Sequence, residues 1–399
     1  MTQPRLAPVP PPEMPSGLPP LDAGSAEHNR RVEQHLLDRI QASPDGFLPF
    51  EAWMADALHA PGLGYYTAGN TKFGSHTPTG DFTTAPEMTP VVGQVLARQV
   101  AQVLDAAGTA NVLEFGAGTG ALAASVIPAL QELGIDVRYF ILEISADLVE
   151  RQKERLAPYG TAVQWLDALP DSFEGCVLAN EVLDAMPAVL FRWDESGTLM
   201  ELGVQAHSGA TPPFQWAERP AGDWLRSIVD ARMPPLPGYR SELNLHAEAW
   251  MRGMGSWLKT GAALLIDYGF PQREYFHPQR NTGTLMCHFR HYSHAEPLVL
   301  AGVQDITAHV DFTAMADAAL EGGLDVLGYT SQARFLLNAG LPEMLQGMMA
   351  LPGIQSTLSA VQKLVSEAEM GELFKVLAVG RGIEPPLLGF TRGDRRDGL

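Results

Sequence analysis

Cysteine is nearly absent from this chain, which has only Cys176 and Cys287 among 399 residues. Neither has a second cysteine nearby, so the sequence excludes a disulfide scaffold and a cysteine-based zinc site and is typical of a reducing compartment. No apolar run approaches the roughly 18 to 20 residues that cross a bilayer. The N-terminus also lacks the charged segment and apolar stretch of a secretory signal. We therefore expect a soluble, cytoplasmic protein without membrane insertion.

Basic residues are fewer than acidic residues in this chain. The chain has 27 Lys and Arg against 46 Asp and Glu, which gives a formal net charge of -19. Such a charge repels phosphate backbones, so we do not expect nucleic acid as a partner. It suits a cationic partner, although an acidic surface also keeps an ordinary protein soluble.

A metal site is not expected either. Cys287, His288, His291 and His294 lie close together in the sequence, but Pro297 weakens the helix that their spacing would need. Zinc sites usually have a better-defined frame of ligands.

The pattern along the chain predicts several segments. Eight prolines in residues 1–25 predict a disordered tail, because proline resists both helix and sheet. We expect a helical lid at 26–108, with helices near 27–43, 50–59 and 89–107. The remaining prediction is a core at 109–194, 246–270 and 371–385, cap insertions at 195–245 and 271–345, and a flexible tail at 386–399.

Strands and helices alternate within the predicted core. Strands are expected at 111–115, 137–142, 162–166, 175–179, 261–268 and 373–379, with helices at 119–133 and 145–157. This alternation indicates an α/β fold of the Rossmann-like kind with a mostly parallel sheet.

The first strand of the core leads into a glycine loop. Glu114 ends this strand, and Gly116, Ala117, Gly118 and Gly120 follow it. Glycine allows a tight turn and a close approach to a ligand, and ligands of such sheets bind beyond the carboxyl ends of the strands. Glu114 could accept hydrogen bonds from a ligand amine or from the loop. The GxGxG spacing favours S-adenosylmethionine over NAD, whose loop has the GxGxxG register.

Acidic residues follow the next two strands. Glu143 is placed to accept hydrogen bonds from both ribose hydroxyls of an adenosine. Asp167 could bind the adenine amine, and the backbone N–H of Ala168 could reach a ring nitrogen. Each acidic residue alone would indicate only a solvent-exposed side chain at the end of a strand. Together with the glycine loop, the two acidic residues favour a cofactor site.

The fourth strand ends in Asn180, Glu181 and, three residues later, Asp184. Asn180 would lie beside the cofactor. On a helical turn the two carboxylates could face the same way, and a pair of carboxylates matches the fork of a guanidinium. The alternative is that Glu181 caps a helix and Asp184 lies on the surface.

With these residues the chain resembles the MidA family of class I S-adenosylmethionine-dependent methyltransferases, over about residues 30 to 385. The motifs that carry the resemblance are Gly64–Tyr66, Gly80–Glu87, the glycine loop, Asn180–Pro187, Ile266–Gly269, Asp305–Phe312 and Met370–Phe374. The resemblance implies a seven-stranded sheet, an N-terminal lid, an inserted cap and methylation of a protein arginine. The family includes a mitochondrial complex I assembly factor, which would make a complex I subunit the substrate. Ala117 stands where family members often have proline.

Further substrate-binding residues are expected in two places. Asp81, Phe82 and Glu87 belong to the lid, although Asp81 could instead form an Asx turn. The other candidates are Tyr268, His309 and Asp311. His309 and Asp311 could alternatively be a buried histidine and the acid that orients it.

Three other functions are open at this point. The chain could be an assembly or interaction protein that retains the fold with little catalysis, a methyltransferase for a small molecule, or an NAD-dependent oxidoreductase. The sequence does not decide between a monomer and a homodimer.

Overall fold

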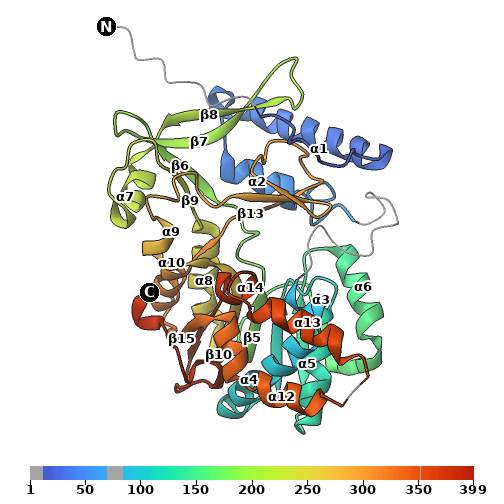
Figure 1. Cartoon of the computed structure of the whole chain (residues 1–399). Coiled ribbons are helices and arrows are strands. Elements are labelled where there is room, and N and C mark those ends of the chain that lie inside the picture. Colours follow the sequence, from blue (N-terminus) through green and yellow to red (C-terminus); the bar gives the residue numbers. More distant parts are fainter. Residues whose placement is uncertain (1–11, 70–83, 351) are drawn as a thin grey trace. The chain divides into compact units, whose positions relative to one another are not determined.

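The computed structural model describes residues 12–69, 84–350 and 352–399. The chain divides into two compact units (Figure 1). The first consists of Met1–Phe82, Pro187–Leu245 and Phe276–Ala308, and the second consists of Thr83–Met186, His246–Tyr275 and His309–Leu399.

The second unit is built on a sheet whose main path has the order β15-β16-β10-β5-β2-β3-β4. The strands are β2 (Asn111–Phe115), β3 (Arg138–Leu142), β4 (Val163–Leu166), β5 (Phe173–Asn180), β10 (Leu258–Phe270), β15 (Asp325–Ser331) and β16 (Phe374–Arg381). β10, β5, β2, β3 and β4 are parallel, whereas β16 is antiparallel to β10 and to β15. The short strand β14 (Val310–Asp311) pairs with the end of β10. The predicted Rossmann-like fold is confirmed, including the seven strands of the main path.

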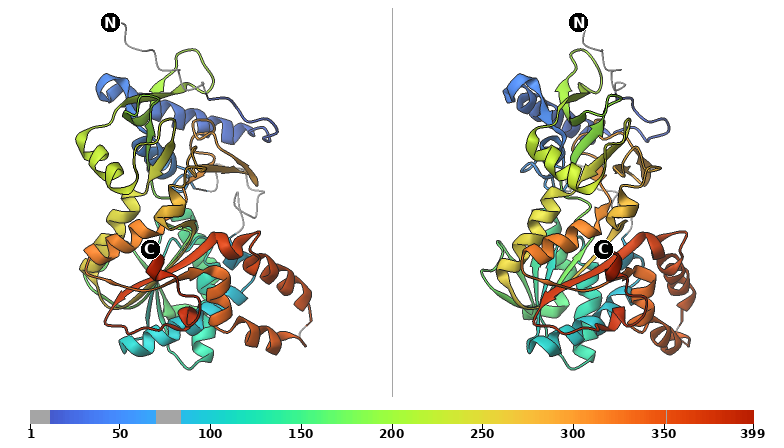
Figure 2. Two further views of the ribbon diagram at one scale, coloured as in Figure 1. Left: turned by 60° about the vertical axis from the view of Figure 1, so that its left-hand side comes forward. Right: turned by 90° about the vertical axis from the view of Figure 1, so that its left-hand side faces the viewer.

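Helices cover both faces of this sheet (Figure 2). On one face α4 (Val91–Ala107) and α5 (Ala121–Glu132) bury Val95, Val100 and Val126 against strand residues such as Val112. On the other face α8 (Leu245–Trp257) and α10 (Phe312–Glu321) bury Met251 and Met315 against residues such as Leu113. Adjacent residues of β2 thus face opposite cores, as the two-residue period of a strand requires. The other helices of this unit are α3 (Ala85–Met88), α6 (Ala146–Leu156), α9 (Gln272–Tyr275), α11 (Gln332–Asn338), α12 (Leu341–Met348), α13 (Ile354–Val365) and α14 (Met370–Leu373).

The strand order places the site. The chain runs outward from β2 to β3 and β4, then returns to build β5 and β10 on the other side of β2. The order therefore reverses between β2 and β5, and ligands of open α/β sheets bind beyond the carboxyl ends of the strands at such a switch point.

The first unit is mostly antiparallel sheet and helix. β1 (Leu48–Pro49), β6 (Val189–Trp193), β7 (Leu199–Ala206), β8 (Phe214–Pro220) and β9 (Arg240–Leu243) form one sheet, and β11 (Met286–Phe289), β12 (Tyr292–His294) and β13 (Asp305–Thr307) form another. The helices are α1 (Ala23–Ala42), α2 (Phe50–His59) and α7 (Asp223–Arg232). Trp53 and Leu36 belong to its core. Within the described ranges, no group of three or more His, Cys, Asp or Glu side chains has an arrangement that could hold a metal ion.

Three predicted segments differ from the structure. The predicted tail 1–25 overlaps α1, because Asp22 caps this helix by accepting a hydrogen bond from the Ser25 N–H at 3.0 Å. The predicted lid 26–108 is divided, since α1 and α2 belong to the first unit and α4 to the core of the second. The predicted insertion 271–345 contains β15, a strand of the main sheet that Gly328 obscures in the sequence.

The C-terminal segment is also different from the prediction of a flexible tail. Phe390 is 3% exposed and packs edge-on against Phe335. The Arg395 N–H donates a hydrogen bond to the carbonyl of Tyr329 at 2.7 Å. Leu387 and Phe390 are buried in the same apolar core as Val95 and Phe335, which anchors the segment after β16 to the second unit. Among the described helices, none is long and apolar enough to cross a membrane.

Candidate active site

The glycine loop joins β2 to α5. Gly116, Gly118 and Gly120 have φ angles of 57°, 55° and 82°, a region that residues with a Cβ atom rarely adopt. The Gly116 N–H donates a hydrogen bond to the carbonyl of Leu142 at 3.0 Å, which fixes the loop to the end of β3. α5 begins directly after Gly120, so its free N–H groups face the loop.

Glu114 lies beneath this loop. It is 2% exposed, and the Tyr139 hydroxyl of the neighbouring strand donates a hydrogen bond to its Oε2 at 2.7 Å. Burial raises the pKa of Glu114 from 4.5 to about 7, and the charge of Glu143 adds to the rise while the Tyr139 bond opposes it. The sequence suggested a ligand amine or the loop as the partner of Glu114. The structure adds Tyr139, which sequence reasoning missed.

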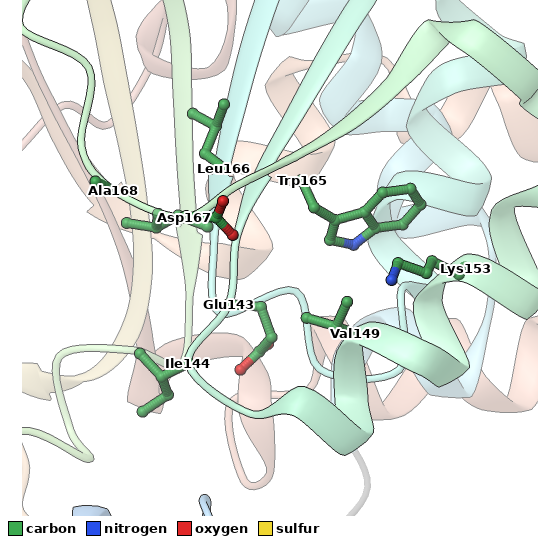
Figure 3. A pocket seen from close by; sticks show the side chains of 9 residues that line it. Glu143, Ile144, Val149, Lys153, Trp165, Leu166, Asp167 and Ala168 are labelled. Atoms are coloured by element: carbon green, nitrogen blue, oxygen red, sulfur yellow. The ribbon is translucent and has the colours of Figure 1, made fainter.

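A pocket of about 440 Å³ lies at the carboxyl ends of β3 and β4 (Figure 3). It is lined by Leu142, Glu143, Ile144, Val149, Lys153, Trp165, Leu166, Asp167 and Ala168. Glu143, Asp167 and Ala168, which the sequence assigned to an adenosine, thus line one cavity. Ile144 is 64% exposed and supplies an apolar side chain to the lining of this pocket.

The carboxylate of Glu143 is held by hydrogen bonds. Its Oε1 accepts from the Ser145 N–H at 3.0 Å, and its Oε2 accepts from Nε2 of Gln152 at 3.1 Å. Burial raises the pKa of Glu143, and these bonds act against the rise. Hydrogen bonds from the backbone N–H groups of Ile144 and Gly118 also lower this pKa, so the carboxylate is held from several sides at the edge of the pocket. With Asp167 for an amine and Ile144 as an apolar wall, the residues present fit the adenosine half of S-adenosylmethionine.

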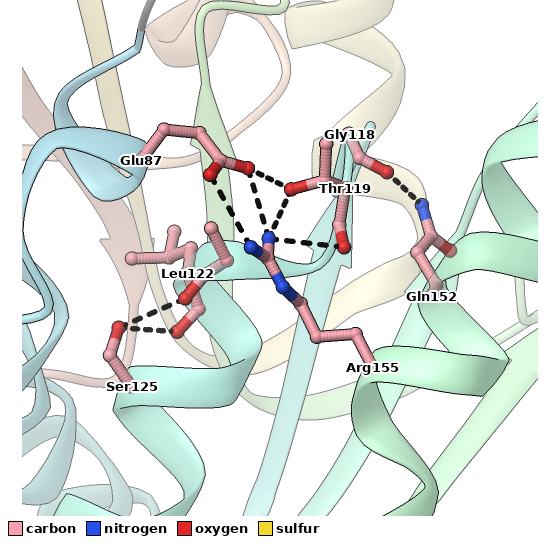
Figure 4. Close-up of polar contacts among 8 residues, drawn as sticks. Glu87, Gly118, Thr119, Leu122, Ser125, Gln152 and Arg155 are labelled. Atoms are coloured by element: carbon pink, nitrogen blue, oxygen red, sulfur yellow. Dashed lines mark hydrogen bonds and ion pairs between the residues drawn. The ribbon is translucent and has the colours of Figure 1, made fainter. Parts of the chain in front are cut away.

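Glu87 lies at the far side of the glycine loop (Figure 4). Arg155 donates to Oε1 of Glu87 at 2.9 Å and to the carbonyl of Thr119 at 3.3 Å, and the Thr119 hydroxyl contacts the same carboxylate. Glu87 therefore fastens α3 to the glycine loop, and Arg155 occupies its carboxylate. Asp81 and Phe82 lie outside the described residues.

The segment after β5 is a turn and not the helical turn expected from the sequence. Glu181 has a φ of 54°, and its N–H donates a hydrogen bond to the carbonyl of Ile266 at 2.9 Å. No helix lies between β5 and β6, a stretch that the structure describes throughout, so the alternative of Glu181 as a helix cap is wrong as well. Asn180 donates to Oε1 of Glu181 at 3.1 Å.

Asp184 and Asp267 form a buried pair beside this turn. They are 3% and 1% exposed, and Oδ2 of Asp267 accepts hydrogen bonds from the N–H groups of Leu183 at 3.0 Å and Asp184 at 3.2 Å. Burial raises the pKa of Asp184 to about 6. Burial, together with the charges of Asp184 and Glu181, raises the pKa of Asp267 well above its ordinary value. The expected surface position of Asp184 in the alternative interpretation is therefore wrong.

The remaining candidates lie around the end of β10. The Tyr268 hydroxyl bonds to the Asp184 side chain, which opposes the rise in the pKa of Asp184. The His309 ring packs edge-on against Tyr268 and stacks on Phe270, with ring centroids 4.9 Å and 5.4 Å apart. Asp311 caps α10, because its Oδ1 accepts from the N–H groups of Thr313 at 3.1 Å and Ala314 at 3.2 Å. Asp311 thus has a structural task that the sequence analysis did not consider.

Asp267 and Gln152 were not among the predicted site residues, although the sequence holds a signal for each. Asp267 lies near the end of an apolar strand that neighbours β5, the same position that singled out the other acids. Gln152 lies in the apolar stripe of α6, four residues before Leu156, where a polar side chain must be buried.

Comparisons with known proteins agree with this geometry. Residues 95–330 match the model of a family described as "Putative S-adenosyl-L-methionine-dependent methyltransferase". The chain is 26% identical to "Protein arginine methyltransferase NDUFAF7, mitochondrial" of Danio rerio, over 89% of this chain and 88% of that protein. It is 25% identical to the Homo sapiens protein of the same name, over 87% and 82%.

A solved structure is more similar. A COG1565 superfamily member from Burkholderia thailandensis, crystallised with bound S-adenosyl-homocysteine, is 46% identical. The match covers 96% of this chain and all of that one, with a TM-score of 0.90.

The relatives' names overturn the predicted cytoplasmic location, since the curated relatives are named mitochondrial. The physical reason is that scarce cysteine indicates a reducing compartment without saying which one.

A glycine loop, a pocket with two acids at the adjoining strand ends and a family match over more than half of the chain point to the same conclusion. The chain belongs to the MidA-like family of S-adenosyl-L-methionine-dependent methyltransferases.

Proposed function

We propose that this methyltransferase modifies an arginine side chain of a protein. The observation that carries the proposal is the group of three carboxyls formed by Glu181, Asp184 and Asp267 at the ends of β5 and β10. Two of them are almost fully buried, and Oδ1 of Asp184 has no hydrogen-bond partner in the described part of the chain. A buried acceptor of this kind costs free energy unless a ligand supplies a donor.

A guanidinium matches these groups well. It carries five N–H donors in a planar fork and a positive charge, so it can bind several carboxylates at once. Its charge would also offset the repulsion that raises the pKa of Asp267. A neutral small molecule would leave that repulsion in place.

The chain's own residues divide the work as follows. Bound S-adenosylmethionine supplies an electrophilic methyl group on a sulfonium. Glu143, Asp167 and the backbone of Ala168 hold its adenosine, and Asn180 with the glycine loop holds the rest. Glu181 and Asp184 bind the guanidinium and draw its positive charge away from the nitrogen that is to be methylated.

The acceptor nitrogen must also lose a proton. Asp184 is suited to take it, because a carboxyl whose pKa is about 6 holds a proton more firmly than an ordinary aspartate does. Tyr268 bonds to this side chain and orients it. His309 borders Tyr268 and would contact the substrate beyond it.

The names of the relatives support the same substrate class, since the zebrafish and human proteins are called protein arginine methyltransferases. By the resemblance stated above, the substrate protein would be a subunit of respiratory complex I.

The test is transfer of labelled methyl groups to proteins from cells that lack this enzyme. The purified enzyme is incubated with these proteins and with methyl-labelled S-adenosylmethionine. The proteins are then hydrolysed and analysed for methylated amino acids. We expect the wild-type enzyme to produce labelled methylarginine. The Glu181→Gln variant should produce no labelled methylarginine. Label in methyllysine, or in a small molecule alone, would contradict the proposal. Binding of S-adenosylhomocysteine without any transfer would favour the interaction protein instead.

A further inference from the structure

Gln152 connects three separate parts of the cofactor pocket. It lies on α6 and is fully buried. Its Nε2 donates hydrogen bonds to the carbonyl of Gly118 at 2.8 Å and to Oε2 of Glu143 at 3.1 Å. Its Oε1 accepts a hydrogen bond from the indole Nε1 of Trp165 at 2.9 Å. Figure 4 shows the first of these contacts, from α6 to the glycine loop.

The three partners fix the orientation of the amide. A glutamine side chain offers two N–H donors on nitrogen and an acceptor oxygen. Here the nitrogen faces two acceptors, and the oxygen faces a donor. The flipped amide would place its oxygen against a carbonyl and a carboxylate, and its N–H groups against an indole N–H. Only one orientation is therefore stable, and both N–H groups of Gln152 are used in it.

Each partner belongs to a different element of the pocket. Gly118 is part of the glycine loop, Glu143 follows β3, and Trp165 lies on β4. Glu143 and Trp165 both line the pocket, whereas Gln152 lies behind them and does not. The fully buried amide therefore acts on a ligand through its neighbours.

We propose that Gln152 is a positioning residue for the cofactor. By holding one edge of the Glu143 carboxylate, it fixes the orientation in which that carboxylate would meet the ribose hydroxyls. By holding the Trp165 indole and the Gly118 carbonyl, it fixes the pocket wall and the loop before the cofactor arrives. Such preorganisation lowers the cost of ordering these groups on binding. The inference rests on the cofactor of the family and is independent of the arginine substrate.

Packing alone does not require glutamine at this position. Burying an amide costs free energy unless its hydrogen bonds are made, and methionine would fill nearly the same volume without that cost. The distinguishing property of glutamine here is its set of three hydrogen bonds.

The first test is calorimetric titration of the full-length Gln152→Met variant with S-adenosylhomocysteine. We expect the Kd to rise at least tenfold, because a hydrogen bond to an ionised group is lost together with two neutral ones. The matched control is Gln131→Met, the same change at an exposed position of α5, for which we expect an unchanged Kd. A folded Gln152→Met protein that binds within twofold of the wild type would overturn the proposal.

The second variant, Gln152→Glu, separates positioning from folding. Two carboxylates about 3 Å apart cannot both ionise readily, so at low pH the new side chain keeps a proton and can still donate one hydrogen bond. At high pH both are charged, and the bond to Glu143 becomes repulsion, which Lys153 in the same pocket offsets only in part. The ratio of the variant's Kd to that of the wild type should rise between pH 5.5 and pH 8.5. A constant ratio in folded protein would overturn the proposal, even where Gln152→Met does not fold.

Discussion

The Tyr139 hydroxyl donates a hydrogen bond to Oε2 of Glu114 at 2.7 Å, between two neighbouring parallel strands beneath the glycine loop. Burial raises the pKa of this carboxyl from 4.5 to about 7. In the folded protein Glu114 therefore binds a proton more tightly than in the unfolded chain.

This pair predicts a specific pH dependence of stability. Below about pH 4.5 Glu114 is protonated in both states, and its contribution to folding is fully present. That contribution decreases as the pH rises above 4.5 and is lost once the pH has passed about 7. At about 1.4 kcal/mol per pKa unit, the shift from 4.5 to about 7 corresponds to a loss of roughly 3 kcal/mol. Glu114→Gln should remove this loss, so the difference in unfolding free energy between the two proteins should grow from pH 4.5 to pH 8. Denaturant unfolding at each pH measures it. A difference that does not vary with pH would show that Glu114 ionises normally.

Tyr139→Phe provides a second comparison. Without the hydroxyl donor the ionised carboxylate is less stable, so the pKa of Glu114 should rise further. The loss of stability should then begin at the same pH as in the wild type but continue to a higher pH and become larger. A shift toward lower pH would contradict the role assigned to this hydrogen bond.

How much of this site the sequence predicted depends on how local the signal was. The glycine loop, Glu143 and Asp167 each follow a strand directly, and parallel strands bring such residues to one edge of the sheet. Gln152 and Asp267 are different, because their most distant partners, Gly118 and Leu183, are 34 and 84 residues away in the chain. Only the three-dimensional arrangement brings those partners together.

The wrong predictions for β15 and for residues 386–399 also have a physical cause. β15 contains Gly328, which weakens a strand pattern, but a Cβ at this position would lie 2.3 Å from the Phe390 ring. The same contact explains why residues 386–399 are packed and not a flexible tail. Composition alone cannot reveal a surface that a distant segment covers.

Turnover should depend on the ionisation of Asp184. Because this carboxyl must be charged to bind a guanidinium, and its pKa is raised to about 6, kcat/KM for an arginine peptide should rise as the pH increases through about 6. Asp184→Asn should lower kcat/KM by about 100-fold, as expected for the loss of a charged partner worth about 3 kcal/mol, and should abolish that inflection. Steady-state rates between pH 5 and pH 8 measure both effects. A wild-type profile that is flat across this range would remove Asp184 from the mechanism.

Glu181 combines a carboxylate that we propose to bind the guanidinium with an unfavourable backbone conformation. Its φ of 54° is costly for any residue with a Cβ atom. Glu181→Ala and Glu181→Gly both remove the carboxylate, but only glycine relieves the backbone. We expect the free energy of unfolding of the glycine variant to exceed that of the alanine variant by about 1 kcal/mol. Both variants should lose turnover. Equal stabilities would mean that the turn relaxes to another conformation.

Cofactor affinity should depend on Asp167. Asp167→Ala removes the carboxylate proposed to bind the adenine amine, and should raise the Kd of S-adenosylhomocysteine about tenfold. Asp171→Ala is the matched control, because Asp171 is also exposed shortly after β4 but does not line the pocket. Calorimetric titration compares the two variants. Similar effects of both changes would point to general electrostatics in place of a specific contact.

Binding of the substrate should itself release protons. Burial raises the pKa of Asp184 to about 6, so near that pH this carboxyl is partly protonated. Burial and the charges of Asp184 and Glu181 raise the pKa of Asp267, so Asp267 also binds a proton more tightly than an ordinary aspartate. A guanidinium placed among them favours their charged forms and lowers both pKa values, which expels the protons that they carried. The observed binding enthalpy of an arginine peptide should therefore change with the ionisation enthalpy of the buffer.

The measurement is calorimetry at pH 6.5 in two buffers, with S-adenosylhomocysteine present. The arginine peptide should release protons, and fewer should be released from Asp267→Asn, which lacks one of the two titrating groups. The same peptide with citrulline, a neutral isostere of arginine, should release none, because only the positive charge lowers the two pKa values. Equal proton release with arginine and citrulline would mean that the carboxyls respond to burial by the peptide, and the case for a guanidinium at this site would fail.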